Sequence, residues 1–408
     1  MAETLTITAL GHGGDGVAET ADGRVFVPYA LPGETIEVER AGKPPRIVGI
    51  SQASPDRVEP LCRHFGACGG CGLQHMERGA YLAWKRQVVI DAFALRGIGA
   101  DVEPIVPIAE GTRRRAVLSA ATTPQGFVLG FNRRGTNDIV PIAECPVLVP
   151  AIAGRLDTLT RLSKILCDRR RPLRLTIVAA DNGLDIAVQG ARRVGRPELE
   201  ALGAMAADPS LARLTVDNNR IFLNRQPEIR SGDTLLLPEP GGFLQAALPA
   251  EEAMAAVVLD HVGKATPVLD LFAGAGTFAL RLARNAPVTA VEGDVALILA
   301  ITTAANRTKH LKPVTTRKRD LFRNPMAPIE LNPFGALVFD PPAGGAKAQV
   351  DQIAASKVAK VVAVSCNPAT LARDARVLID GGYRLVRVAP VDQFLFSAEI
   401  ECVATFER

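Results

Sequence analysis

The residues best suited to covalent chemistry lie in the carboxyl-terminal part of the chain. Cys366 follows the apolar run 358–365, and upstream of it lie Asp340-Pro-Pro and a glycine-rich turn at residues 270–277. The apolar run is predicted to be a buried strand. A cysteine at the carboxyl end of such a strand, downstream of a nucleotide-type pocket, is a candidate nucleophile. Free cysteine is also among the most buried residue types, so its position alone leaves a structural role open.

Together these residue types indicate transfer of a methyl group to a carbon atom. C5 of a uracil ring is a poor nucleophile, and a sulfonium methyl donor cannot alkylate it directly. Addition of a thiolate to C6 gives C5 enolate character, and a base must afterwards remove the C5 proton so that the thiol leaves. The chemistry requires a thiolate, a base, a donor pocket and hydrogen-bond donors to the ring oxygens. The sequence offers a candidate for each.

The candidate donor pocket is the turn Asp270-Leu-Phe-Ala-Gly-Ala-Gly-Thr277, which follows a predicted strand and opens a predicted helix. Its small residues let the backbone approach a ligand closely. It has neither the Walker nor the Rossmann spacing. The next predicted strand ends in Glu292, whose carboxylate can accept both hydroxyls of a ribose, and Asp320 is placed to meet an adenine amino group. This order predicts a class I methyltransferase that binds S-adenosylmethionine.

Acidic residues near the end of the chain are candidates for the pocket wall and the base. Asp340 ends a predicted strand and precedes two prolines, which stiffen the backbone and remove donors. Amino-nitrogen methyltransferases place an aromatic residue after a similar motif, whereas Ala343 stands here, which counts against amino methylation. Glu399 and Glu401 would face the same side of a strand, so the pattern does not decide which is the base.

Four of the seven cysteines have the spacing of a metal site. They are Cys62, Cys68, Cys71 and Cys145. The spacing matches neither paired zinc knuckles nor the motif of radical enzymes, and four thiolates suit zinc or an iron–sulfur cluster. An odd cysteine count with no recognisable export signal makes disulfides unexpected.

Composition predicts a globular protein of two or three domains. Apolar residues make up 48% and charged residues 22% of the 408 residues, and the net charge is +4. Neither a signal peptide nor a membrane span is expected, so we expect a cytoplasmic protein. Arginine and lysine cluster at residues 113–115, 133–134, 169–171, 192–193 and 317–319. Such clusters can follow a phosphate backbone, although any one of them can also be ordinary solvated surface.

Three regions are predicted along the chain. Residues 1–55 alternate short apolar runs with glycine turns, which indicates a small β-barrel. Residues 56–248 combine a predicted helix at 81–95 with strand-like runs, which indicates a mixed α+β region. Residues 249–408 alternate helices with short apolar runs, which predicts a doubly wound parallel sheet in an α/β domain. The glycine turn, Asp340 and Cys366 would lie beyond the carboxyl ends of its strands, where ligands bind.

From end to end the chain resembles the RNA uracil-5-methyltransferase family. The amino-terminal segment, with Gly-Asp-Gly-Val-Ala18 and Ala30-Leu-Pro-Gly-Glu34, looks like a TRAM domain, an OB-like RNA-binding barrel. Residues 54–60 with the three clustered cysteines resemble the family's cluster segment, and Cys145 matches its fourth ligand. The resemblance therefore implies a [4Fe-4S] cluster in place of zinc.

The resemblance also implies roles in the methyl-transfer site. Residues 365–374 give the most specific match and make Cys366 the nucleophile, while the final segment selects Glu401 over Glu399 as the base. Asp340 would lie beside the target base and the donor. The donor residues implied are Gln245, Phe272, Gly274, Gly276, Thr277, Glu292, Asp320 and Asp340. Departures from the family pattern stand at Ala247, Ala343, Leu395, Phe396 and Glu399.

The target is less well specified than the reaction. A barrel and a cluster together favour ribosomal RNA within the family, specifically 23S RNA, with transfer RNA second, and a monomer is expected. Cytosine-5 methylation is an alternative, although it commonly uses a Pro-Cys nucleophile and Cys366 follows serine. A non-catalytic, cluster-containing RNA-binding protein is a third possibility, because residues 395, 396 and 399 are altered.

Overall fold

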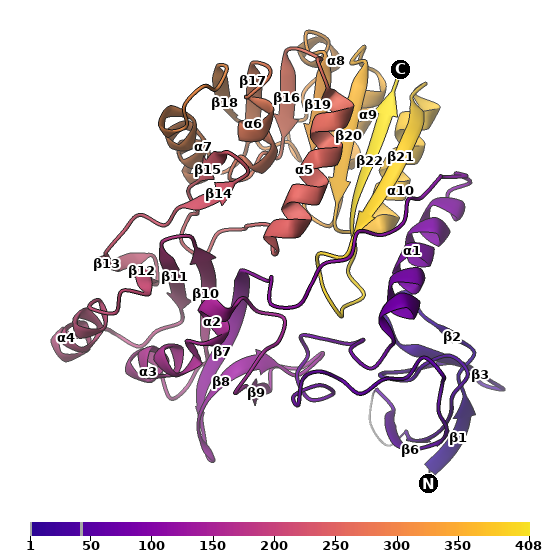
Figure 1. The fold of residues 1–408 in the computed structure, drawn as a ribbon, viewed down its shortest axis with the longest axis vertical. Helices are drawn as coiled ribbons and strands as arrows, with labels where there is room; N and C mark the ends of the chain where they lie inside the picture. Colours follow the sequence, from indigo (N-terminus) through magenta and orange to yellow (C-terminus); the bar gives the residue numbers. More distant parts are fainter. Residues whose placement is uncertain (1, 41–43) are drawn as a thin grey trace.

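The computed structural model describes residues 2–40 and 44–408. Two seven-stranded sheets dominate the fold, and smaller sheets lie near the amino terminus and between the two large ones. Figure 1 shows the carboxyl-terminal sheet at the top, the central sheet at the lower left and the amino-terminal strands at the lower right. Each of the three predicted regions therefore contains sheets of its own.

The amino-terminal strands form two three-stranded antiparallel sheets, ordered β1-β5-β6 and β2-β3-β4. Burial alternates along β5, with Ile36 and Val38 inside, as expected for a strand with one buried face. Apolar residues of both sheets share one core. The amino-terminal region is thus two packed three-stranded sheets, and the TRAM-type barrel stays a prediction. The strands are β1 (Ala2–Thr6), β2 (Ala9–Leu10), β3 (Gly16–Thr20), β4 (Gly23–Val27), β5 (Thr35–Glu39) and β6 (Arg46–Gln52).

Helix α1 (Arg78–Ala94) begins three residues before the predicted helix, because the Glu77 side chain accepts the Ala80 N–H and caps it. Its buried face joins the core of the carboxyl-terminal sheet and packs against α10 (Pro368–Asp380). The predicted boundaries assign α1 to the central region, but its packing ties it to the carboxyl-terminal one.

The central sheet has the order β13-β12-β11-β10-β7-β8-β9 and is antiparallel except between β11 and β12. Three short helices contribute to its apolar core. Its elements are β7 (Arg115–Thr123), β8 (Gly126–Asn132), β9 (Ile139–Pro141), α2 (Pro150–Ala153), α3 (Leu156–Leu166), β10 (Leu173–Ala180), β11 (Gly183–Gln189), α4 (Arg196–Met205), β12 (Leu211–Val216) and β13 (Asn219–Leu223). A hairpin follows, formed by β14 (Ile229–Ser231) and β15 (Thr234–Leu236).

The carboxyl-terminal sheet has the order β18-β17-β16-β19-β20-β22-β21. The first five strands are parallel, but β22 is antiparallel to both of its neighbours, so the predicted all-parallel sheet was wrong at this edge. Its elements are α5 (Leu248–Val262), β16 (Val268–Leu271), α6 (Thr277–Leu282), β17 (Val288–Glu292), α7 (Val295–Arg307), β18 (Val314–Lys318), α8 (Pro328–Leu331), β19 (Ala336–Phe339), α9 (Lys347–Ala354), β20 (Lys360–Ser365), β21 (Arg384–Val391) and β22 (Glu401–Glu407).

This topology brings the candidate residues to one edge of the sheet. The carboxyl ends of β16, β19 and β20 lead directly into the glycine turn, Asp340 and Cys366. Because β22 runs in the opposite direction, its first residue, Glu401, lies at the same edge, and Cys402 pairs with Ser365. Sheets of this kind bind ligands at this edge.

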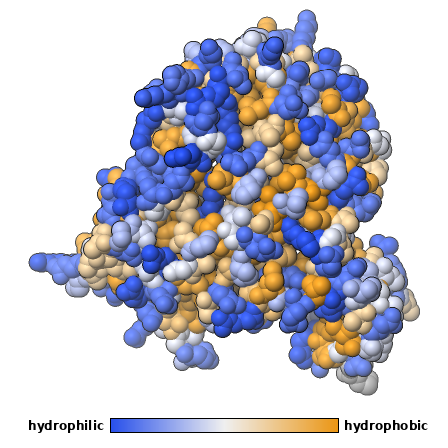
Figure 2. Space-filling view, viewed as in Figure 1, coloured by the Kyte–Doolittle hydropathy of each residue, from blue (hydrophilic) through white to orange (hydrophobic). Residues whose placement is uncertain are grey.

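Figure 2 shows hydrophilic residues along much of the rim of one face and hydrophobic residues towards its middle. Scattered exposed apolar residues are normal on a protein surface. Within residues 2–40 and 44–408, none of the helices has both the length and the hydropathy needed to cross a lipid bilayer.

Candidate active site

Cys366 occupies the tight connection between β20 and α10. The Ser365 hydroxyl accepts the Asn367 N–H at 3.2 Å, and the Asn367 side chain in turn accepts the N–H groups of Ala369 and Thr370. The cap starts α10 immediately after the cysteine, as is usual for asparagine at this position. Cys366 is therefore held by a rigid turn, and it remains partly exposed.

The Cys366 thiol is protonated at neutral pH. Burial, and then the negative charges of Glu401, Asp340 and Glu399, raise the pKa of this thiol to about 11. Since the thiolate is the reactive form, a nearby group must accept the proton when the sulfur attacks. The neighbouring carboxylates are placed for this task.

A chain of side-chain hydrogen bonds links the buried carboxylate of Glu401 to the partly exposed carboxylate of Asp340. The Gln245 Nε2 donates to Asp340 Oδ2 at 3.1 Å. The Gln393 Nε2 donates both to Gln245 Oε1 and to Glu401 Oε2, each at 2.8 Å. The two glutamines and Glu401 are at most 3% exposed. The structure thus joins the predicted base, the predicted donor-contacting glutamine and Asp340 into one network.

Burial raises the pKa of Asp340, to about 7, and that of Glu401 well above its ordinary value, with the Asp340 charge adding to the latter. Such shifts suit carboxylates that exchange protons near neutral pH. Glu401 is buried at the first position of β22, whereas Glu399 is exposed and lies outside that strand. Only Glu401 therefore points into the network.

The glycine turn has the backbone geometry that its residues predict. Gly274 and Gly276 have φ angles of +55° and +92°, and Phe272 adopts +58° without being glycine. A Cβ at Gly276 would lie 3.2 Å from the side chains of Ile301 and Leu280. The turn is therefore closely packed on the inside, and the strained Phe272 is the kind of outlier found at functional sites. Thr277 begins α6 directly after it.

Two acidic residues predicted to bind the donor, Glu292 and Asp320, lie outside the glycine turn. Glu292 accepts the Gly274 N–H at 3.0 Å, which ties the end of β17 to the turn. Asp320 is exposed and accepts the N–H groups of Phe322 and Arg323 at 3.0 and 3.2 Å. The rings of Phe272 and Phe322 lie 5.2 Å apart, so an aromatic pair lies between the turn and Asp320.

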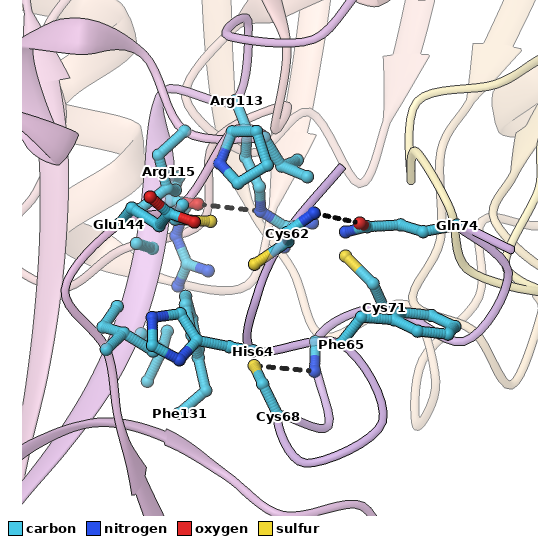
Figure 3. Close-up of a pocket in the computed structure, with 18 residues that line it drawn as sticks. Cys62, His64, Phe65, Cys68, Cys71, Gln74, Arg113, Arg115, Phe131 and Glu144 are labelled. Atoms are coloured by element: carbon cyan, nitrogen blue, oxygen red, sulfur yellow. Dashed lines mark hydrogen bonds between the residues drawn. The ribbon is translucent and has the colours of Figure 1, made fainter. Parts of the chain in front are cut away.

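The four predicted metal-binding cysteines line one cavity of about 230 Å³. Figure 3 shows Cys62, Cys68 and Cys71 around this cavity, together with Arg113 and Arg115. The Cys62 N–H donates to Gln74 Oε1, and the Gly70 N–H donates to Cys68 Sγ. Across the described residues, however, no three His, Cys, Asp or Glu side chains are arranged to hold a single metal ion.

The sequence did not single out two residues of the site. Gln393 follows β21 by two positions, and its role depends on contacts with Gln245, which is 148 positions away in the chain. Phe322 follows Asp320 by two positions and is 55% exposed, which is unusual for a phenylalanine. Two features of the sequence could have indicated these residues: Gln393 is a polar residue close to Glu401, and Phe322 is an aromatic residue close to Asp320.

Comparisons with known proteins show which family this chain resembles. A family model described as tRNA (Uracil-5-)-methyltransferase matches residues 239–408. An uncharacterized RNA methyltransferase of Brucella suis is 46% identical over 99% of this chain and 97% of its own. The 23S rRNA (uracil(1939)-C(5))-methyltransferase RlmD of Halomonas elongata is 36% identical over 99% of this chain and 89% of its own.

A solved structure extends the likeness to three dimensions. The Pyrococcus abyssi tRNA (uracil-54, C5)-methyltransferase, in complex with S-adenosyl-L-homocysteine, covers 99% of both chains with a TM-score of 0.75. At 24% identity this likeness shows the fold, and it confirms the predicted class I methyltransferase architecture. With relatives matched over nearly its whole length, the chain belongs to the RNA uracil-5-methyltransferase family.

Proposed function

We propose that this enzyme methylates C5 of a uridine in 23S ribosomal RNA, with S-adenosylmethionine as donor and with transient addition of Cys366 to C6. The observation that carries the proposal is the network that joins Asp340 and Glu401 through two glutamines beside the Cys366 thiol. A thiol and a buried base side by side are what addition and elimination at a pyrimidine require.

The donor site fits S-adenosylmethionine on features of this chain. Asp270 is 1% exposed, burial raises its pKa, and none of the described residues donates a side-chain hydrogen bond to it. Such a carboxylate favours a cationic ligand nearby. Glu292 and Asp320 offer acceptors for hydroxyl and amino groups, and Phe272 and Phe322 offer ring faces. When bound, the donor supplies an electrophilic methyl group.

The residues of this chain carry the remaining steps. Because the target carbon must reach both sulfur and donor, the uridine has to leave its base stack. As the Cys366 sulfur attacks C6, the thiol proton passes to the Asp340 carboxylate, and the electron pair of the C5–C6 double bond makes C5 nucleophilic. After C5 takes the methyl group, the Glu401 carboxylate removes the C5 proton. The double bond re-forms as the bond from C6 to sulfur breaks. Asp340 holds the ring.

The cysteine cavity is proposed to hold a [4Fe-4S] cluster. Its four cysteines come from two separate stretches of sequence, and the cavity is far larger than one metal ion requires. Four thiolates around such a cluster leave a net negative charge, which the partly buried guanidinium of Arg113 on the cavity wall complements. The reaction requires no electron, so the cluster would supply structure or RNA placement. Iron and sulfide analysis of anaerobically purified protein, with Cys71→Ser as control, tests this.

The ribosomal target rests on the relative from Halomonas elongata, and transfer RNA is the second candidate because the Pyrococcus abyssi enzyme acts there. The amino-terminal sheets would act as a TRAM-type RNA-binding unit, with the arginine clusters adding affinity. A monomer acting in the cytoplasm, where ribosomal RNA is found, completes the proposal. The domain boundaries stay a prediction.

Nucleoside mass spectrometry of 23S and transfer RNA from cells lacking the gene tests the function. Loss of 5-methyluridine from 23S RNA supports the proposal, and loss from transfer RNA alone would replace the target. Loss of 5-methylcytidine would indicate cytosine methylation instead. RNA that contains 5-fluorouridine separates enzyme from non-catalytic binder, because fluorine at C5 cannot be eliminated and a covalent complex should persist.

A further inference from the structure

We propose that Gln393 is a positioning residue that orients both the base Glu401 and the donor-site Gln245 through a single amide nitrogen. The inference rests on the proposed covalent function. It assigns a role to Gln393, to which neither the sequence motifs nor the proposed reaction steps give one. Gln393 touches no reacting atom in this scheme and acts through its two neighbours.

The hydrogen bonds of Gln393 determine which side chain can serve here. Its Nε2 has two hydrogens, and both are used, one on Gln245 Oε1 and one on Glu401 Oε2. A hydroxyl would supply one hydrogen only. A lysine would supply enough hydrogens, but its charge would pair with Glu401 and lower the raised pKa of that carboxyl. A neutral amide orients the base without adding a charge; its hydrogen bond lowers the pKa of Glu401, but burial still keeps that pKa well above its ordinary value.

Stability does not account for this amide. Gln393 is 2% exposed, and none of the described residues donates to its Oε1, which is buried. A buried acceptor without a donor weakens the fold, and an apolar side chain of similar volume would avoid that loss. The two donated bonds therefore point to a role in the site.

Contacts of the neighbouring residues fix the main chain on both sides of Gln393, which keeps its amide directed at Glu401 and Gln245. The preceding Asp392 accepts bonds from Lys85 Nζ at 2.7 Å and from the Tyr81 hydroxyl at 2.5 Å. Downstream, Phe396 adopts a φ of +59°, and its carbonyl accepts the N–H groups of Gly72 and Leu73 at 2.8 and 3.0 Å. The segment is thus fixed on both sides of the glutamine.

The consequence for the reaction is specific to elimination. One carboxylate oxygen of Glu401 is held by Gln393, which leaves Oε1 to receive the C5 proton. When that proton leaves, its bonding pair forms the C5–C6 double bond, and the C6–sulfur pair returns to Cys366. Without the Gln393 bond the carboxyl group can rotate, so methylated RNA should remain attached to the enzyme for longer.

The test uses full-length Gln393→Met, which keeps the volume and removes both donors. Single-turnover reactions with radiolabelled S-adenosylmethionine and 23S RNA fragments are quenched and run on a denaturing gel. This separates methylated RNA still bound to protein from released product. We expect release to slow about 10- to 100-fold, as for a general base that is present but poorly aligned. The covalent fraction should rise, and the KM for the donor should increase several-fold through Gln245.

Two further variants separate positioning from structure. Gln349→Met removes another buried amide, which bonds to the Met326 backbone away from the site, and should leave the covalent fraction unchanged. The release rate of Gln393→Glu, divided by that of wild type at the same pH, should increase as the pH falls, because the protonated form of the new side chain can donate one bond to Glu401.

The outcomes divide cleanly. A wild-type-like covalent fraction and release rate in Gln393→Met overturn the proposal, and so does loss of methyl transfer without any bound RNA in a folded variant. An equal rise in Gln349→Met also overturns it. If wild-type enzyme forms no covalent complex with 5-fluorouridine RNA, the proposed function itself fails, which is a separate result.

Discussion

The pair formed by Lys85 and Asp392 offers the sharpest test of how the active-site segment is held. Both side chains are 0% exposed, and their Nζ and Oδ1 atoms lie 2.7 Å apart. Replacing Lys85 by Met removes the ammonium group and leaves the Tyr81 hydroxyl as the side-chain hydrogen-bond donor to the Asp392 carboxylate among the described residues. Breaking a buried pair in this way typically costs about 3–5 kcal/mol. Arg78 lies 3.1 Å from Oδ2 but without hydrogen-bond alignment, so we expect the lower end, about 3 kcal/mol.

Lys85→Met should lower both the free energy of global unfolding and the local stability of the segment around Asp392. Urea unfolding gives the change in free energy from the shift in midpoint at unchanged slope. Hydrogen exchange reports on the Phe396 N–H, which donates to the Tyr81 oxygen at 2.9 Å and should exchange about 10²-fold faster. The matched control is Lys347→Met at an exposed position, where we expect a change within about 0.5 kcal/mol.

A double variant completes the test. Lys85→Met with Asp392→Leu removes both charges, and such replacements usually restore much of the lost stability. A single variant that costs less than about 1 kcal/mol would refute the reasoning. A double variant no more stable than the single one would do the same.

Four further outcomes are expected. Cys366→Ala should abolish turnover while circular dichroism and melting temperature stay close to wild type; methyl incorporation at the wild-type rate would exclude a covalent role. Glu401→Gln should slow turnover about 10²- to 10⁴-fold and accumulate covalent RNA on denaturing gels, unlike an inactive variant that never forms the adduct. The pKa values of Cys366, Asp340 and Glu401 are raised, and the base acts deprotonated, so single-turnover rates should rise from pH 6 to pH 9; a flat profile would contradict this. Phe322→Ala should weaken donor binding by about 0.5–1.5 kcal/mol in calorimetry, with unchanged affinity arguing against a stacking role.

The sequence predicted the elements best where local pattern and burial agree. The apolar run 358–365, predicted to be a buried strand, contains β20 (Lys360–Ser365), because a strand buried on both faces is apolar along most of its length. The direction of β22 could not be read in this way, since apolar content does not distinguish parallel from antiparallel pairing. The two-residue period of a strand could not decide whether Glu399 or Glu401 is the base. In the structure β22 begins at Glu401, so that Glu399 lies outside the strand.

The candidate site was predictable in its motifs and unpredictable in its connections. Cys366 and Asp340 follow strand ends, which are visible in one sequence. The link from Glu401 to Gln245 through Gln393 is a matter of tertiary contact. Nor can any local rule anticipate a lysine with 0% exposure such as Lys85, because charged residues are buried only when paired, and its partner is distant in the chain.

That distance has a consequence for biosynthesis. The Tyr81 hydroxyl and its acceptor Asp392 are 311 positions apart, so nearly the whole polypeptide must emerge before α1 receives its counter-charge. Contacts between opposite ends of a chain form late and slow folding. An isolated carboxyl-terminal fragment would lack α1. The loop that begins at Asp392 would then lose its hydrogen bonds to Tyr81 and Lys85. The nascent enzyme should therefore depend on completion of translation, and on protection from aggregation until then, before any methylation is possible.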